Sequence, residues 1–280
     1  MAITTACALS LGLGIFLGRS GDLRAPAAAS LKSDEASSES MAEIKLELAP
    51  GDLAGLLKLL DLPRESSSAK QRTITFFDSR DLALLQEGII LRARVNPDGD
   101  GETTIKLRDL RDEEFDSSLH SRDGFKCEWD RGTRPDPGHR NCSYSDDRGA
   151  LEFAHVLVIK DRPLTTLFSS KQLKYFEDSA LPRLRMKDPW ESLQPMGPVR
   201  SSTWKAAAPF APDLELTVEL WEIPGVNRML EISVRAPATE SDDAASRLEE
   251  WIRRNQLQVL HSQASKTVWV LKHFAGQSRR

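Results

Sequence analysis

The sequence predicts an α+β fold, in which a closed antiparallel β-barrel encloses a polar lumen and helices pack on its outside. Most segments after Met41 alternate apolar and polar residues, which is typical of strands with one polar face. The polar faces carry charges of both signs, and closure of the sheet would collect these charges in one lumen. Two further segments have the periodicity of helices that cover an apolar surface.

Seven alternating segments are the expected strands. Their ranges are 43–48, 73–77, 90–95, 103–108, 125–130, 214–220 and 230–235. An ordinary half-exposed sheet also alternates in this way, because antiparallel sheets commonly face water on one side. Pairs of Arg and Lys occur here beside pairs of Glu and Asp on several strands, which favours closure around one charged lumen. Closure of the barrel would turn the charged side chains toward the lumen and the apolar side chains outward. We expect Glu43, Arg92, Arg94, Lys106, Arg108, Glu128, Asp130 and Glu219 to point inward, and Ile44, Leu91, Ile105, Leu107 and Val218 to point outward under helices.

Helices are expected at 51–62 and at 241–257. The first carries leucines on one face, and the second opens with Ser-Asp-Asp, which suits the positive end of a helix dipole. The charged stretches 109–124 and 131–149 contain Gly or Pro and are predicted to be surface loops. The run Pro-Asp-Gly-Asp-Gly at 97–101 predicts a hairpin turn.

The composition restricts the class of partner. The chain has 38 basic and 42 acidic residues and a net charge of −4, whereas a nucleic-acid-binding protein usually has a basic excess. The three cysteines, Cys7, Cys127 and Cys142, are widely spaced and form no C-x-x-C pair. They indicate neither a zinc knuckle nor a disulfide framework, and they favour a reducing compartment such as the cytoplasm.

The first forty residues differ from the rest of the chain. Their apolar stretch at 3–17 is short for a membrane span and has no Lys or Arg ahead of it, and 24–40 is a tether of small and polar residues. We therefore expect no stable membrane span, and a disordered extension at 1–40 upstream of a natural start at Met41. The alternative is a segment for export or organelle targeting. The folded domain is expected at 41–275, followed by a short tail at 276–280.

The order of these segments resembles the CYTH superfamily of triphosphate tunnel enzymes. That superfamily includes thiamine triphosphatases, inorganic triphosphatases and class IV adenylate cyclases. The best segment, 76–94, reads FFDSRDLALLQEGIILRAR and is similar to the family's Tyr-Phe-Asp-Thr…Leu…Gly…Leu-Arg-x-Arg pattern. The resemblance runs from Glu43 to about Phe274. It includes Thr104–Arg108, Lys126–Asp130, Val199–Arg200, Glu219, Glu231 and Lys266.

The resemblance implies metal-dependent hydrolysis of a triphosphate compound: inorganic triphosphate, thiamine triphosphate or a nucleoside triphosphate. The implied ligands of Mg²⁺ or Mn²⁺ are Glu43, Glu128, Asp130, Glu219 and Glu231. The implied phosphate-binding residues are Arg92, Arg94, Lys106, Arg108, Lys126, Arg200 and Lys266. Among these, Lys106, Lys126 and Arg200 are expected to be catalytic, because they would stabilise the charge of the transition state while a polarised water attacks the terminal phosphorus.

Two departures from the family pattern bear on activity. The family opens with Glu-x-Glu-x-Lys, whereas this chain has Glu43, Lys45 and Glu47 in that order. A lysine in place of a metal-binding carboxylate would repel the cation, unless Glu47 reaches the same site. The later Glu-x-Glu is here Glu231-Ile-Ser233. These departures keep two alternatives open: a tunnel that binds polyphosphate or a nucleotide without turnover, and a class IV adenylate cyclase.

Overall fold

The computed structural model describes residues 41–65, 68–110, 117–119, 121–132, 138–149, 163–184, 188–260 and 265–277. The predicted extension 1–40 lies outside the described residues, as do 278–280. Helix α6 (Lys266–Gln277) continues past the domain boundary expected at 275. In the described part of the chain, no helix is long and apolar enough to cross a membrane.

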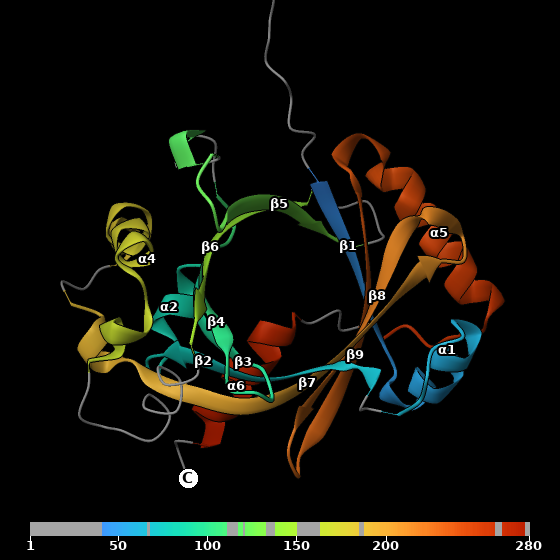
Figure 1. Cartoon of the computed structure of the whole chain (residues 1–280), viewed down its shortest axis with the longest axis horizontal. Coiled ribbons are helices and arrows are strands. Elements are labelled where there is room, and N and C mark those ends of the chain that lie inside the picture. Colours follow the sequence, from blue (N-terminus) through green and yellow to red (C-terminus); the bar gives the residue numbers. More distant parts are fainter. Residues whose placement is uncertain are drawn as a thin grey trace, which may run out of the picture. The chain divides into compact units, whose positions relative to one another are not determined.

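Nine strands close into one barrel in the order β1-β5-β6-β4-β3-β2-β7-β8-β9 (Figure 1). The predicted closed barrel is therefore confirmed. One pair departs from the expected antiparallel arrangement, since β1 and β5 run parallel from the pair Ala42–Trp129 to the pair Ile44–Arg131. The strands are β1 (Met41–Leu48), β2 (Lys70–Asp78), β3 (Ile89–Val95), β4 (Gly101–Leu107), β5 (Phe125–Arg131), β6 (His139–Arg148), β7 (Gln194–Ala208), β8 (Ala211–Ile223) and β9 (Asn227–Pro237).

Strand β6 corrects the prediction of a loop at 131–149. It pairs with β4 on one side and β5 on the other, so the barrel closes through it. Its inner positions carry uncharged polar residues such as Asn141 and Ser143, and its outer positions include Cys142 and Tyr144. With so few apolar residues, the period-two signal is too weak to identify a strand. The turn predicted at 97–101 is confirmed, since Val95 and Gly101 pair at the base of a β3–β4 hairpin.

The helices are α1 (Leu53–Leu59), α2 (Ala83–Gln86), α4 (Ser170–Tyr175), α5 (Ser241–Arg254) and α6. Both helices expected from periodicity are present as α1 and α5, each shorter than predicted. Figure 1 shows α1 and α5 outside the barrel on one side and α4 on the other. One outer core contains the buried Ile44 and Val218 with residues of α1 and α5, and the other contains Leu91, Ile105 and Leu107. The predicted outward set is therefore buried under helices.

Helix α6 packs against apolar residues on the inner face of the barrel. Ile74, Phe76 and Trp221 form a third core with Val270 and Leu271 of α6. The lumen therefore has an apolar part, which α6 covers, and a charged part beyond it.

Cys127 and Cys142 form a disulfide across β5 and β6, at directly opposite positions of the ladder. This corrects the expectation that the cysteines indicate no disulfide. The two residues are 15 positions apart in the sequence, and they meet because β6 is a strand and not a loop. The cysteines therefore do not favour a reducing compartment, since disulfides persist mainly in oxidising compartments.

Candidate functional site

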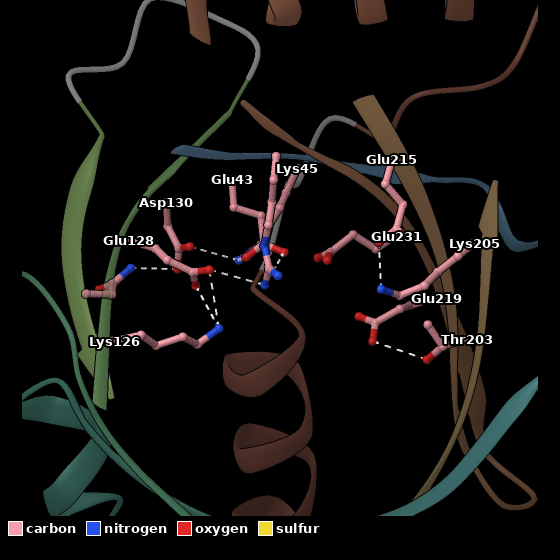
Figure 2. A network of polar contacts seen from close by, with 12 residues as sticks. Glu43, Lys45, Lys126, Glu128, Asp130, Thr203, Lys205, Glu215, Glu219 and Glu231 are labelled. Carbon is pink, nitrogen blue, oxygen red and sulfur yellow. Dashed lines mark hydrogen bonds and ion pairs between the residues drawn. The ribbon is translucent and has the colours of Figure 1, made fainter. Parts of the chain in front are cut away.

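The charged faces of the strands meet inside the barrel. On β1, Ile44 is buried in the outer core, and its neighbours Glu43 and Lys45 therefore face the lumen. The same alternation directs Arg92 and Lys106 inward. Ion pairs connect the charged faces of neighbouring strands within the lumen, as Figure 2 shows for β1 and β5.

Glu43, Glu128 and Asp130 form the acidic cluster between β1 and β5. One carboxylate oxygen of each lies within 4.8 Å of the others, so their spacing could hold a metal ion. Glu43 comes from β1, whereas Glu128 and Asp130 are successive inward positions on β5. The parallel pairing sets Glu43 opposite Asp130, and this register brings the three carboxylates together.

Lys45 inserts its ammonium group into this acidic cluster. Its Nζ lies 2.7 Å from Glu43 Oε2 and 3.0 Å from Asp130 Oδ1. Lys106 Nζ lies 2.9 Å from the other Asp130 oxygen. Burial alone would raise the pKa of Asp130, but Lys45 and Lys106 hold this pKa well below its usual value. Burial would likewise lower the pKa of Lys45, but Glu43 and Asp130 raise it above the ordinary lysine value. Asp130 and Lys45 are therefore both charged at neutral pH.

Two glutamates of β8 and β9 hold a second lysine. Glu219 and Glu231 are paired across the two strands, and Lys266 at the start of α6 contacts both, with its Nζ 2.6 Å from Glu231 Oε1. Glu47 of β1 continues this row, because it lies opposite Glu231 in the ladder. Burial would raise the pKa of Glu219, but Lys266 lowers it to about 2. Lys266 Nζ also lies 5.0 Å from the ring centre of Trp221.

Three arginines occupy the basic part of the lumen. Arg72 comes from β2, and Arg92 and Arg94 come from the neighbouring strand β3. Glu102 of β4 accepts from Arg94 at 2.6 Å and lies 3.8 Å from Arg72. Arg92 donates to Thr104 Oγ1 at 3.3 Å, while its buried Nε has no hydrogen-bond partner among the described residues. Burial, with the nearby charge of Arg94, lowers the pKa of Arg92 well below its ordinary value.

A pocket of about 440 Å³ adjoins these arginines. Its lining includes Arg72, Arg94 and Glu102 together with Asn96, from the end of β3, and Asp147 of β6. The lining therefore joins cationic and anionic groups at the hairpin end of the barrel.

The remaining predicted cations differ in position. Arg108, just after β4, donates to Ser265 Oγ at 2.9 Å, and burial lowers its pKa while Asp130 opposes this shift. Lys126 is exposed and lies 3.2 Å from Glu128 Oε2.

The structure does not bring Arg200 to the lumen. Its neighbour Val199 is buried in the core beneath α6, so Arg200 lies on the outer face of β7, where it is exposed. Its ladder partners are Thr73 and Glu222. The lumen side of β7 instead presents Thr203, which donates to Glu219 at 3.4 Å. The alternation along β7 therefore excludes the placement expected from the resemblance.

Sequence reasoning missed three charged residues of the lumen. Arg72 lies two positions before Ile74 on the same face of β2, and extending the alternation by one step would have found it. Glu102 similarly precedes Thr104 and Lys106. Arg235 shares a face with Glu231 and lies 3.2 Å from Glu128 Oε1.

No family model matches the sequence, and no curated protein matches it. Among solved structures, a putative adenylate cyclase from Bacillus halodurans matches with a TM-score of 0.54 and 14% sequence identity, covering 81% of this chain and 95% of that chain. A putative adenylyl cyclase from Hippeastrum, described as having a dominant triphosphatase activity, matches with a TM-score of 0.54 and 16% identity, covering 81% and 93%. The chain thus shares its closed-tunnel fold with putative adenylate cyclases, one of which is a triphosphatase.

Proposed function

We propose that the lumen binds a triphosphate compound and hydrolyses it. The arginine cluster of Arg72, Arg92 and Arg94 is the observation that carries this proposal. Arg72 and Arg94 share the single carboxylate of Glu102. Burial and the nearby Arg94 lower the pKa of Arg92, so its positive charge is unfavourable without a bound anion. Like charges gathered in a confined space favour an anionic ligand, and guanidinium groups grip phosphate in a bidentate manner.

The proposed phosphate path continues from the arginines to the lysines. In the β3–β4 ladder, Arg92 pairs with Thr104 and Ile90 pairs with Lys106, so Arg94, Arg92 and Lys106 follow one another along the lumen. Arg108 and Lys126 extend this row of cations toward the acidic cluster. A chain of three phosphates would find a cation at successive positions, whereas a single phosphate would use only part of the row.

Hydrolysis would take place where the cations meet the acidic groups. The lysine and arginine donors would hold the phosphate oxygens and stabilise the charge that develops in the transition state. A carboxylate at the boundary, such as Glu128 or Glu219, would orient the attacking water. Arg200 has no part in this proposal because of its outward position.

Divalent metal ions require a separate consideration. The spacing within the acidic cluster suits an ion, but Lys45 already contacts two of its three carboxylates, so these residues do not fit a resident metal. Mg²⁺ commonly binds proteins through one or two carboxylates plus the phosphates of a substrate. We therefore propose that Mg²⁺ or Mn²⁺ enters as the complex of the triphosphate, as part of the substrate.

A phosphate-release assay of the full chain tests the proposal. Tripolyphosphate, thiamine triphosphate and ATP would each be assayed with Mg²⁺ and with Mn²⁺, beside Arg92→Met as the inactive comparison. We expect release from at least one compound and its loss in the variant. Absence of both release and binding would reject the proposal.

A tunnel that binds triphosphate without turnover is the second candidate, and the observation that favours it is Lys45 within the acidic cluster. Tight binding of tripolyphosphate without phosphate release would support this candidate. Cyclic nucleotide formed from ATP would instead support the cyclase activity that the fold relatives suggest.

A further inference from the structure

We propose that Lys45 is a built-in cation that takes the place of a divalent metal ion between Glu43 and Asp130. The position of Lys45 bears on whether the tunnel needs a metal cofactor, and this consequence rests on the proposed function. It predicts that the protein without substrate has no metal ion of its own at the acidic cluster.

The contacts of Lys45 are those of a bridging cation. A divalent ion in the cluster would contact oxygens of Glu43 and Asp130, and the ammonium of Lys45 contacts both, at 2.7 and 3.0 Å. The backbone determines this position, because β1 pairs in parallel with β5 and the side chain of Lys45 extends inward between the two carboxylates (Figure 2). On its other side, Lys45 lies opposite Ser233 of β9, which brings no further carboxylate.

The charge of the cluster leaves no excess for a metal ion. Its three carboxylates are within ion-pair distance of four cationic side chains. These are Lys45, Lys106, Lys126 and Arg235. These four cations already outnumber the three carboxylates by one charge. A divalent ion would add two more positive charges, and charges a few ångströms apart repel strongly when they are partly shielded from water.

The second pair of glutamates has a similar arrangement. Lys266 contacts both Glu219 and Glu231, just as Lys45 contacts Glu43 and Asp130. Two lysines, one from β1 and one from α6, thus each bridge two carboxylates of the lumen. Of the two, Lys45 is the informative one, because it stands in the cluster whose oxygens have the spacing of a metal site.

Calorimetric titration with MnCl₂ in the absence of any triphosphate tests the inference. We expect the native full chain to bind Mn²⁺ weakly, and Lys45→Met to bind it at least about tenfold more tightly, because the variant removes the competing charge and keeps the carboxylates. Mn²⁺ should also raise the melting temperature of Lys45→Met more than that of the native protein. Adding Glu128→Gln to Lys45→Met should abolish both gains.

Lys205→Met is the matched control. It removes a lysine that pairs with Glu215 at 2.6 Å, away from the acidic cluster, and should leave Mn²⁺ binding at the native level. Equal Mn²⁺ affinities for native and Lys45→Met proteins would overturn the inference. Tight binding by the native protein that Glu128→Gln abolishes would also overturn it, and this comparison decides the matter if Lys45→Met does not fold. Because no triphosphate is present, neither result bears on the hydrolysis assay.

Discussion

Arg94 Nη1 lies 2.6 Å from Glu102 Oε1, and this contact joins the neighbouring strands β3 and β4 in the basic part of the lumen. Burial would raise the pKa of Glu102, but Arg94, and after it Arg92 and Arg72, lower it. Glu102 therefore stays ionised and offsets part of the charge of the arginine cluster. An incoming phosphate would compete with this carboxylate for Arg94.

Glu102→Gln should therefore strengthen anion binding. The substitution keeps the shape of the side chain and removes the charge that competes with phosphate. We expect the affinity for tripolyphosphate, measured by calorimetry, to rise about threefold to tenfold. The melting temperature should fall because Arg72 and Arg94 lose their shared ion-pair partner. Weaker binding would show that Glu102 supports the ligand and does not compete with it.

Arg92→Met should separate binding from stability. Burial and the neighbouring Arg94 lower the pKa of Arg92 and so disfavour its charged form. Replacing it by an apolar side chain of similar length should raise the free energy of unfolding by about 1 kcal/mol. The affinity for tripolyphosphate should fall at least about tenfold. Arg200→Met, on the outer face of the barrel, should change neither; a loss of binding in that variant would contradict the placement of Arg200.

Lys106 predicts a dependence on pH. Burial lowers its pKa from the ordinary 10.5 to about 8, against the opposing effect of Asp130. The folded protein therefore binds fewer protons than the unfolded chain between about pH 8 and 10.5, and the contribution of Lys106 to the free energy of unfolding should rise with pH in this window. Tripolyphosphate affinity should fall over the same window as the ammonium loses its charge. Lys106→Arg stays charged and should remove this decline; an identical decline in the variant would assign it to another group.

Exchanging Lys45 and Glu47 restores the order of the resembling family. Lys45→Glu would add a carboxylate to Glu43, Glu128 and Asp130, and Glu47→Lys would place a cation opposite Glu231. We expect the double variant to bind Mn²⁺ more tightly than Lys45→Met alone, because it gains a ligand as well as losing a charge. Weaker Mn²⁺ binding than that of the native protein would mean that the native order is already tuned for the metal.

The Cys127–Cys142 disulfide should stabilise the barrel. It closes a loop with a sequence separation of 15 residues, and a cross-link of that span contributes about 3 kcal/mol in the loop-entropy account. Urea unfolding with and without a reductant measures this contribution. The double variant Cys127→Ser/Cys142→Ser should be insensitive to the reductant, and the same insensitivity in the native protein would show that the thiols are not joined.

The sequence was most informative where a strand has one apolar and one charged face. Glu43–Leu48 and Leu91–Val95 are of this kind, and the structure places their apolar residues in or against the outer cores. Strand β6 was missed because most of its inner face is polar without charge, Asp147 excepted, and its outer face has few apolar residues. The disulfide was missed with it, since its geometry depends on that strand.

The site could be predicted as a set of charges but not as a set of contacts. Alternation along one strand gives the face on which a residue lies, whereas its partners depend on register between strands. Lys45 contacts Asp130 because β1 and β5 are parallel, an arrangement that no pattern within either segment encodes. The outward position of Arg200 likewise follows from Val199, whose burial under α6 depends on a distant helix.

A crystal structure of the full chain with a non-hydrolysable imido analogue of tripolyphosphate tests the central claim most directly. We predict that the phosphate oxygens lie within hydrogen-bond distance of the guanidinium groups of Arg92 and Arg94, with Lys106 at the next phosphate. An analogue bound on the outer face of β7 near Arg200, or a lumen that stays without the analogue at saturating concentration, would contradict the account.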